Sequence, residues 1–324
     1  MTDPPLLVDT HAHFLTPDYV HAARAAGHIR PDGMGAWPTW RAEVHLRLMD
    51  RWGVGTSLLS ISSPGTHFGD DSEARALTRH VNESGAAIRR EHPDRFGHFA
   101  SLPLPDVEGA LGEVAHAMDH LGSDGVIVGT NTHGIYLGDA RYEPLYAELN
   151  RRRTPVFLHP TSPPHAEDVA LGRPRPMLEF VFDSTRTVSD LLFSGVFERY
   201  PDIPWIVSHG GGALPLLTDR MELFRSIFSE GADGPGPIPE QVSRLWFDMA
   251  GTPFPRQIPA LTALVGNHRL LYGSDHCWTP AAGVDAQLAS IAAAQQPGND
   301  TWHALTTRNA HRLFPRLARM RQEQ

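Results

Sequence analysis

Two histidines near the start of the chain have a spacing that suits a metal site. His11 and His13 follow the short apolar run Leu6–Thr10, which has the composition of a buried β-strand. Side chains alternate along a strand, so residues two apart point to the same side. Both imidazoles can therefore reach one cation, and the pattern predicts the first part of a metal site at the end of this strand.

Later apolar segments of the chain end in the same way. They end at three residues that can bind a metal or carry a proton, namely His159, His209 and Asp275. Because the same arrangement recurs along the chain, we interpret these side chains together with the two first histidines as candidates for one shared site.

The elements that must position these residues form a repeated strand and helix pattern. The candidate strands are rich in Val, Ile, Leu and Phe and lack clean alternation, which is typical of strands buried on both faces. They comprise residues 6–10, 56–61, 97–102, 125–129, 155–159, 204–209, 245–249 and 269–275. Between the strands, apolar residues recur at helical spacing. One such predicted helix ends at Gly53, and another begins near Asp106 and ends at Gly122.

Eight strand and helix units predict an α/β fold, a distorted TIM (β/α)8 barrel. We find no linker, repeat or low-complexity block that divides the chain, so we expect residues 1–324 to form a single domain. In such a barrel the active site lies at the C-terminal ends of the strands, and all five candidate side chains fall there. The first and last strands are neighbours in a closed barrel, so residues far apart in sequence can converge.

A long insertion separates the first strand from the first helix. Residues 14–40 contain Gly, Pro and aromatic residues, and the segment is too long for an ordinary βα loop. We expect a lid or a pocket wall, with Trp37 and Trp40 as candidate aromatic lining and Trp40 as a candidate substrate-binding residue. Alternatively, both tryptophans anchor the segment to the barrel.

The composition excludes several classes of protein. The 324 residues carry a net charge of −9, and none of the 28 basic residues is lysine, so a carbamylated lysine or a Schiff base is excluded. With Cys277 as the single cysteine, neither an internal disulfide nor a Cys-based zinc site can form. The only basic run is Arg151–Arg153, so we expect no nucleic-acid partner. Neither a signal peptide nor a membrane-spanning run is evident, and we expect a cytoplasmic protein with no membrane contact.

The strand-end motifs resemble those of the amidohydrolase superfamily. The similarity is to its decarboxylase branch, around aminocarboxymuconate semialdehyde decarboxylase and the resorcylate- and methylsalicylate-type decarboxylases. It covers nearly the whole chain, and the motifs are specific as a set in this order. The matching stretches are VDTHAH at 8–13, VFLHP at 156–160, SHGGGALP at 208–215, YGSD at 272–275 and NAHRLF at 309–314.

The resemblance implies a ligand set for one metal ion. In the family, the residues that match His11, His13, His159 and Asp275 hold one divalent metal, and the residue that matches His209 lies beside it as a catalytic group. Three neutral imidazoles and a carboxylate suit zinc, and manganese is the alternative because a carboxylate and an oxygen-rich substrate favour harder ions. The absence of lysine argues against a binuclear site, and no organic cofactor is expected.

Further residues are candidates for substrate binding. The turn at 210–212 is all glycine, as in the aminocarboxymuconate branch, where the resorcylate branch has an acidic residue. The former branch holds a substrate carboxylate with arginines, one of them from a neighbouring subunit, so the resemblance implies a homodimer. Arg220 is a candidate match or else a surface helix residue. Residues 129–139 resemble the methylsalicylate type, and His133 there either touches substrate or caps the loop.

Together these features favour a metal-dependent, non-oxidative decarboxylase of a small aromatic, ortho-hydroxybenzoate-type carboxylic acid. His209 or Asp275 would deliver the proton, although an aminocarboxymuconate-type route that begins with hydration of a double bond remains open. The alternative activity is metal-dependent hydrolysis of a small ester, lactone or amide, because the same ligands can polarise a carbonyl. The third hypothesis, a metal-binding scaffold without catalysis, is disfavoured because His209 and every expected ligand are present.

Overall fold

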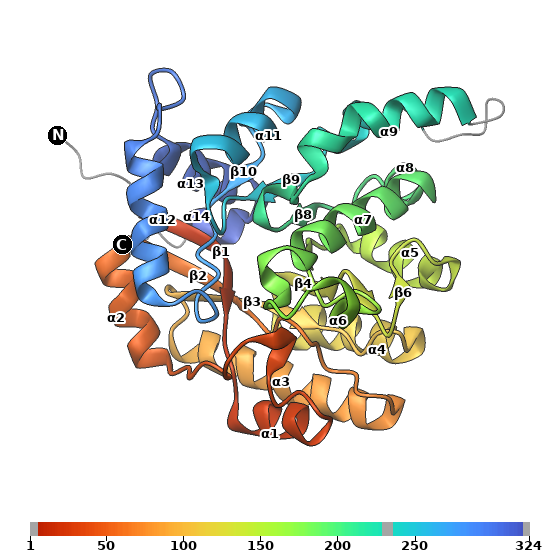
Figure 1. Ribbon diagram of the computed structural model, residues 1–324. Helices are drawn as coiled ribbons and strands as arrows, with labels where there is room; N and C mark the ends of the chain where they lie inside the picture. Colours follow the sequence, from red (N-terminus) through yellow and green to blue (C-terminus); the bar gives the residue numbers. More distant parts are fainter. Residues whose placement is uncertain (1–5, 229–235, 320–324) are drawn as a thin grey trace.

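A computed structural model describes residues 6–228 and 236–319, and its centre is a sheet of eight parallel strands surrounded by helices (Figure 1). The strand order is β1-β2-β3-β4-β7-β8-β9-β10. The strands are β1 Leu7–His13, β2 Val54–Ser60, β3 Phe96–Ser101, β4 Gly125–Gly129, β7 Val156–His159, β8 Trp205–Val207, β9 Trp246–Asp248 and β10 Leu270–Leu271. All eight overlap the strands that the hydrophobic pattern predicts.

The sheet closes on itself where the chain beyond β10 pairs with β1. Parallel bridges join Asp9 to Tyr272 and Ala12 to His276, and the Thr10 amide donates to the Tyr272 carbonyl at 2.9 Å. The closure confirms the predicted (β/α)8 barrel. It also brings residues near both ends of the sequence into contact.

The interior of the barrel is filled by one apolar side chain from each strand. These are Val8, Leu58, Phe99, Ile127, Phe157, Ile206, Trp246 and Leu271. Phe314 and Leu317 join this cluster from the last two helices, α13 Trp302–Leu313 and α14 Pro315–Arg319. The Asn309 amide donates to the carbonyl of Leu270, the first residue of β10, so α13 covers the N-terminal end of the barrel. The C-terminal strand ends are left for a site.

Long helices pack around the barrel. They are α2 Ala42–Trp52, α3 Asp71–Glu91, α4 Val107–His116, α5 Glu143–Arg152, α7 Glu179–Phe193, α9 Leu214–Phe228, α11 Ile258–Val265 and α12 Ala281–Ala293. Helix α2 ends at Gly53, and the α4 segment begins at the N-cap Asp106 and closes at Gly122 after a short π-helical turn. Both glycines adopt the left-handed conformation that a helix end favours, as the sequence predicts. Short helices α8 Val196–Arg199 and α10 Ile238–Val242 complete this layer.

The insertion after β1 contains structure of its own. It forms α1 Pro17–Ala25 and a 3-10 turn at Pro31–Gly33 before α2 begins. Trp37 is buried, donates to the His28 carbonyl at 2.8 Å and packs against Trp278. Trp40 donates to His45 Nδ1 at 2.9 Å. The contacts of both tryptophans anchor the insertion to the barrel.

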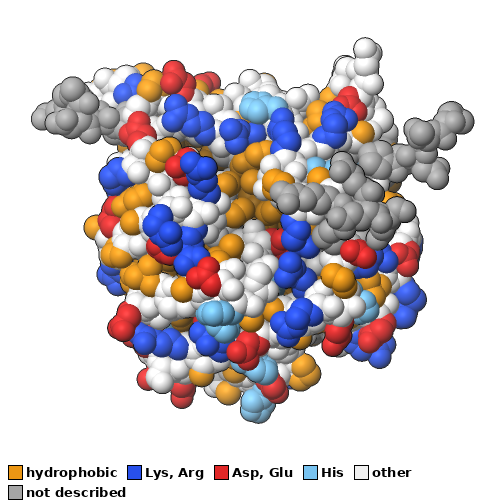
Figure 2. Space-filling model, turned by 180° about the vertical axis from the view of Figure 1, so that it is seen from behind, with side chains coloured by type: hydrophobic (Ala, Val, Ile, Leu, Met, Phe, Trp, Pro, Cys, Tyr) orange, Lys and Arg blue, Asp and Glu red, His pale blue; other side chains and the backbone are white. Residues whose placement is uncertain are grey.

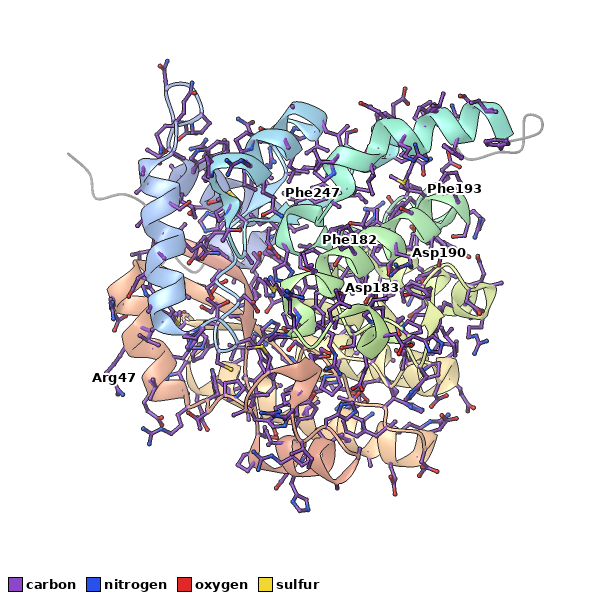
Figure 3. All side chains as sticks on the ribbon, viewed as in Figure 1. Arg47, Phe182, Asp183, Asp190, Phe193 and Phe247 are labelled. Atoms are coloured by element: carbon purple, nitrogen blue, oxygen red, sulfur yellow. The ribbon has the colours of Figure 1, made fainter. Side chains whose placement is uncertain are left out.

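Two buried or half-buried carboxylates of α7 hold the loop that follows β4. The loop contains the two-stranded hairpin β5 Asn131–Thr132 and β6 Ile135–Tyr136. Asp183 accepts hydrogen bonds from the Asn131 amide at 2.9 Å and from the Tyr136 hydroxyl at 2.6 Å, and Asp190 accepts one from the Gly138 amide. Figure 3 labels both carboxylates on α7. The loop is therefore tied to the helix that follows β7.

Charged side chains of both signs are interspersed over the face that Figure 2 shows. Within the described residues, we find no helix with the length and apolar character needed to cross a bilayer.

Candidate metal centre and active site

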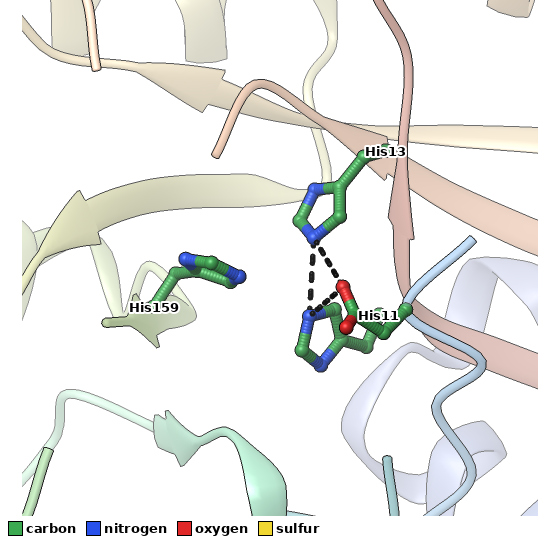
Figure 4. A group of neighbouring side chains, drawn as sticks. His11, His13 and His159 are labelled. Carbon is green, nitrogen blue, oxygen red and sulfur yellow. Dashed lines mark hydrogen bonds and ion pairs between the residues drawn. The ribbon is translucent and has the colours of Figure 1, made fainter. Parts of the chain in front are cut away.

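The first two histidines lie on β1 with their rings close together. Both side chains are buried, and His11 Nε2 lies 3.1 Å from His13 Nε2 (Figure 4). The rings meet edge to face with centroids 4.9 Å apart. The alternation of side chains along β1 thus directs both imidazoles to one point, as their spacing predicts.

His159 and Asp275 complete a group of four. His159 is the last residue of β7, and Asp275 follows β10, so closure of the barrel brings both to β1 although they lie far downstream in the sequence. Asp275 Oδ1 lies 3.3 Å from Nε2 of both His11 and His13. One potential ligand atom from each of the four residues lies within 4.8 Å of the others.

Each imidazole is held from outside through its other ring nitrogen. His11 Nδ1 lies 2.9 Å from Asp248 Oδ2, His13 Nδ1 lies 3.0 Å from Ser60 Oγ, and His159 Nδ1 lies 2.8 Å from the Pro160 carbonyl. A carboxylate and a carbonyl only accept, so Nδ1 of His11 and His159 carries the proton and leaves Nε2 with a lone pair. Such outer partners are typical of metal-ligating histidines. Three nitrogens and one carboxylate oxygen fit a divalent cation such as zinc or manganese.

The electrostatics of the group favour a cation at its centre. Burial lowers the pKa of His13 and brings that of His159 well below its usual range, which keeps both rings neutral. Burial also acts to lower the pKa of His11, but the carboxylates of Asp248 and Asp275 raise it to about 10. Burial acts to raise the pKa of Asp275, yet the neighbouring histidines hold it well below its usual range. The pocket therefore combines two neutral imidazole donors, His13 and His159, with an anionic carboxylate, whereas His11 would have to release its Nε2 proton when a metal binds.

His209 lies beside this group in an unusual backbone conformation. It follows β8 and has φ +52°, and its Nε2 lies 3.7 Å from Asp275 Oδ2. Its Nδ1 is buried without a hydrogen-bond partner among the described residues. Non-glycine residues with positive φ are uncommon and occur at functional sites. Asp275 itself has φ +57°, so both candidate proton carriers share this feature.

A cavity of about 510 Å³ opens over His159, His209 and Asp275. This volume lies within the range of about 300–1,000 Å³ that is usual for small-molecule sites. The rest of its wall is mainly apolar and includes Met34, Pro174, Pro176, Met177, Phe180, Val181, Trp278 and Pro280. Asp32 adds a buried carboxylate from the insertion. The arrangement can hold a small, largely apolar molecule against the four-residue group.

The three candidate substrate-binding residues lie outside the described lining of this cavity. Trp40 packs near Phe14 within the insertion. His133 lies 3.0 Å from His67 and lines a second, outer cavity of about 1160 Å³, which shares Asp32 with the inner one. Arg220 is exposed on α9, where its guanidinium stacks 4.9 Å above the Phe224 ring. Contact of these residues with substrate stays a prediction.

Sequence reasoning missed two carboxylates at the site. Asp248 ends β9 and contacts His11, and the same pattern of a polar residue at a strand end could have identified it. Asp32 occupies a loop position with φ +51°, and no local pattern distinguishes it from the other acidic residues of the chain.

Comparison with known proteins agrees with the fold. A family model described as Amidohydrolase matches residues 8–316. The 6-methylsalicylic acid decarboxylase of Penicillium expansum is 34% identical over 318 residues, which cover 96% of each protein. A crystal structure described as amidohydrolase II superposes with a TM-score of 0.89 at 34% identity, covering 95% of this chain and 99% of that one.

A third protein shares the fold at lower identity. The dihydroxybenzoic acid decarboxylase of Polaromonas sp. JS666, solved with bound manganese and the inhibitor 2-nitroresorcinol, has a TM-score of 0.81 at 22% identity, covering 95% of this chain and 96% of that one. The extent of the family match and the two relatives at 34% identity place the chain within one family. The protein belongs to the amidohydrolase family, as its strand-end motifs predict.

Proposed function

We propose that the protein is a metal-dependent decarboxylase, a carboxy-lyase that removes carbon dioxide from a small ortho-hydroxybenzoate-type acid without oxidation. The observation that carries the proposal is the cavity, which has His159, His209 and Asp275 on one side and an apolar wall on the other. The relative named 6-methylsalicylic acid decarboxylase, which aligns with 96% of the chain, supports the same reaction class.

His11, His13, His159 and Asp275 are the proposed metal ligands, because their potential ligand atoms lie within 4.8 Å of one another. A bound divalent metal would supply a Lewis acid there that attracts the oxygens of an ortho-hydroxy acid. The apolar wall, with Phe180 and Trp278, then holds the aromatic ring and excludes water from it. Fixing the ring in one orientation lowers the entropy cost of the proton transfer.

His209 and Asp275 are the proposed proton carriers. Their Nε2 and Oδ2 atoms lie 3.7 Å apart at the cavity wall, so His209 can hold a proton near the substrate, whereas Asp275, whose pKa lies well below its usual range, would carry one only after receiving it from His209. General acid catalysis adds this proton to the ring carbon that bears the carboxylate. The electron pair of the carbon–carboxylate bond then returns to the ring as carbon dioxide leaves, and the ring regains its aromaticity. The deprotonated side chain takes its next proton from solvent.

We propose zinc as the metal, with manganese as the alternative. Three imidazole nitrogens favour zinc, whereas the carboxylate of Asp275 and an oxygen-rich substrate suit manganese. The bound manganese of the Polaromonas decarboxylase supports the alternative. Elemental analysis of the purified protein, followed by reloading of the apoprotein with each ion, would distinguish the two.

We further propose a homodimer that forms through α9 and α7. Helix α9 exposes five apolar side chains. Four of them lie 7, 8, 11 and 12 residues after the first, and this spacing places all five on one face of the helix. They are Leu216, Leu223, Phe224, Ile227 and Phe228. The neighbouring α7 exposes Phe182 and Phe193, which Figure 3 labels. Exposed apolar side chains on two neighbouring helices favour an interface, and a second copy could bury them around a two-fold axis.

The proposed reaction can be tested by mass spectrometry. The metal-loaded protein is incubated with ortho-hydroxybenzoates, including 6-methylsalicylate, and with simple esters and lactones. We expect loss of carbon dioxide from one or more of the acids. Addition of water to an ester or lactone, with every acid unchanged, would instead identify a hydrolase and contradict the proposal.

A further inference from the structure

We propose that Asp248 is a positioning residue that aligns the metal site and the proton donor with one carboxylate. This inference rests on the proposed function. One oxygen, Oδ2, lies 2.9 Å from His11 Nδ1, and the other, Oδ1, accepts the backbone amide of His209 at 2.9 Å. Oδ1 also accepts the amide of Ala250 at 2.9 Å. The side chain is completely buried, so these contacts hold it in one place.

The Oδ2 contact sets the chemistry of His11. A carboxylate can only accept, so His11 must carry its proton on Nδ1 and present the Nε2 lone pair to the cation site. His11 Nε2 lies 3.3 Å from Asp275 Oδ1 and 3.1 Å from His13 Nε2, at the centre of the four-residue group. Loss of such an outer partner typically weakens metal affinity by about 10–100-fold.

The Oδ1 contact acts on the backbone of His209. With φ +52°, this residue adopts a conformation that a non-glycine residue rarely takes, so its surroundings must maintain it. Asp248 holds the amide on one side of the residue, and Gln257 Nε2 donates to the His209 carbonyl at 2.5 Å on the other. Together the Asp248 and Gln257 side chains fix the position of the His209 imidazole relative to Asp275.

Asp248 and His11 can approach each other only because the neighbouring residue of the chain after β10, Gly273, has no side chain. A Cβ on Gly273 would lie 2.6 Å from the Cβ of His11 and 3.2 Å from that of Asp248. Strands β1 and β9 and the segment after β10 therefore approach closely at this point. Asp248 can reach His11 and the His209 backbone at the same time because these three segments meet.

The two contacts can be separated by two substitutions. Asp248→Asn retains an oxygen for the two amides but presents an NH₂ group to His11, which must then move its proton to Nε2. Gln257→Leu removes only the contact with the His209 carbonyl and leaves His11 untouched. Positioning through Asp248 therefore predicts a metal defect in Asp248→Asn with His209 in place, and a displaced His209 in Asp248→Ser, which retains neither carboxylate oxygen; an undisplaced His209 in Asp248→Ser would overturn this half of the proposal. Gln257→Leu leaves Asp248 intact, so it tests the support of the His209 backbone from its other side and predicts a purely catalytic defect.

Zinc titration of the apoprotein tests the His11 contact without any substrate. We expect Asp248→Asn to raise the zinc Kd by about 10–100-fold. The matched control is Asp183→Asn, which alters another buried carboxylate that accepts several hydrogen bonds but contacts none of the proposed metal ligands, and its zinc Kd should stay unchanged. If Asp248→Asn does not fold, Asp248→Ser removes the partner of His11 with a smaller side chain. Wild-type zinc affinity in the folded variant would overturn this half of the proposal.

Kinetics and crystallography test the His209 contact. We expect Gln257→Leu to lower kcat about tenfold or more with KM and zinc content unchanged, and its crystal structure should show a displaced His209 imidazole. Gln241→Leu is the control, because Gln241 likewise donates to a backbone carbonyl, that of Gly236, away from the site, although it is more deeply buried than Gln257. If His209 is undisplaced in Gln257→Leu and kcat is that of the wild type, the support of the His209 backbone by Gln257 is wrong.

These measurements also distinguish a failure of the Asp248 role from a failure of the proposed decarboxylase activity. If the wild-type protein decarboxylates none of the acids, the proposed function fails, while zinc affinity and the position of His209 still decide the role of Asp248.

Discussion

At the level of single residues, the candidate site separates metal binding from proton transfer. His11, His13 and His159 use Nδ1 for outer hydrogen bonds and direct Nε2 inward, which is the arrangement that a metal ligand needs. His209 differs because its Nδ1 lacks a partner among the described residues and the side chain lines the cavity. Substitution of His209 should therefore impair the reaction without emptying the metal site.

We predict that His209→Ala lowers kcat by about 10²–10⁴-fold, the usual contribution of a positioned proton donor or acceptor. Metal content should remain that of the wild type, because His209 is not among the four proposed ligands. Steady-state kinetics and elemental analysis check both outcomes. His120→Ala, at an exposed position remote from the cavity, serves as the control. Unchanged turnover in His209→Ala would remove His209 from the mechanism.

Asp32 should determine which charged substrates the cavity accepts. It is buried in the wall, its Oδ1 accepts the Ser162 hydroxyl at 2.5 Å, and no arginine is among the described residues that line the cavity. A second carboxylate on the substrate would therefore meet a like charge in the cavity wall, although Arg175 Nε lies 3.3 Å from the Ser162 hydroxyl that Asp32 binds. We expect hydroxybenzoates with one carboxylate to be preferred over dicarboxylate analogues.

Asp32→Asn should reduce the preference for substrates with one carboxylate by about tenfold in kcat/KM, which corresponds to about 1.4 kcal/mol. The measurement is the ratio of kcat/KM values for a hydroxybenzoate and its analogue with a second carboxylate. The same ratio in the variant and the wild type would show that the Asp32 charge does not select the substrate.

At the level of elements, the glycine turn between β8 and α9 places His209. Gly210, Gly211 and Gly212 all have positive φ, between 59° and 74°, and directly follow a histidine with positive φ. A Cβ on Gly212 would lie 2.2 Å from the Val181 carbonyl oxygen in α7. Gly212 is thus required by the close approach of the turn to α7, whereas a Cβ on Gly210 would meet Gln257 and one on Gly211 would meet Phe247.

We predict that Gly212→Ala lowers the free energy of unfolding by about 1–3 kcal/mol, because the left-handed backbone and the contact with Val181 both oppose a side chain. Urea denaturation would measure the change. Gly112→Ala provides the contrasting control, since its Cβ would meet nothing within 4 Å on helix α4. A helical Gly→Ala change of this kind should stabilise by about 0.5–1 kcal/mol. Equal stability changes in the two variants would contradict the interpretation.

At the level of the whole molecule, a buried histidine should make the fold sensitive to acid. His98 is buried on β3, and burial, with a smaller effect of Arg89, lowers its pKa to about 3. In the unfolded chain the value is about 6.5, so below that pH the unfolded state binds a proton that the folded state does not. The associated stability is fully present above pH 6.5 and is lost as the pH falls toward 3.

His98→Gln should therefore weaken the pH dependence of stability between pH 6 and 4 by about 1.4 kcal/mol per pH unit. Urea denaturation of both proteins at several pH values measures this slope, and the absolute stability of the variant at neutral pH does not enter the comparison. An unchanged slope would show that His98 does not carry this acid sensitivity.

The exposed face of α9 predicts the state of association. We expect the wild-type protein to have about twice its chain mass of 35.7 kDa in solution, and Ile227→Glu to be a monomer because it places a charge on the apolar face. Light scattering after gel filtration distinguishes the two. Ile29→Glu is a matched control, since Ile29 and Ile227 are each 61% exposed and Ile29 lies in the insertion. A monomeric wild-type protein would refute the proposed dimer.

The barrel and most of its strand-end residues could be predicted from the amino-acid sequence alone. Buried parallel strands are recognisable because they are short continuous apolar runs, and helix ends carry local signals such as Gly53 and Asp106. The strand ends of a barrel face one site, so His11, His13, His159, His209 and Asp275 could be grouped before their distances were known.

The tertiary structure decided which other side chains surround the site. His11 and Asp248 meet although 237 positions separate them, and no local pattern encodes that contact. Asp32 enters the cavity wall, whereas Trp40 packs against His45 of α2 and Phe96 of β3, because a long βα segment takes its path from what it packs against. Local periodicity specifies elements, but cavity lining depends on how distant elements approach one another, and only the closed barrel establishes that.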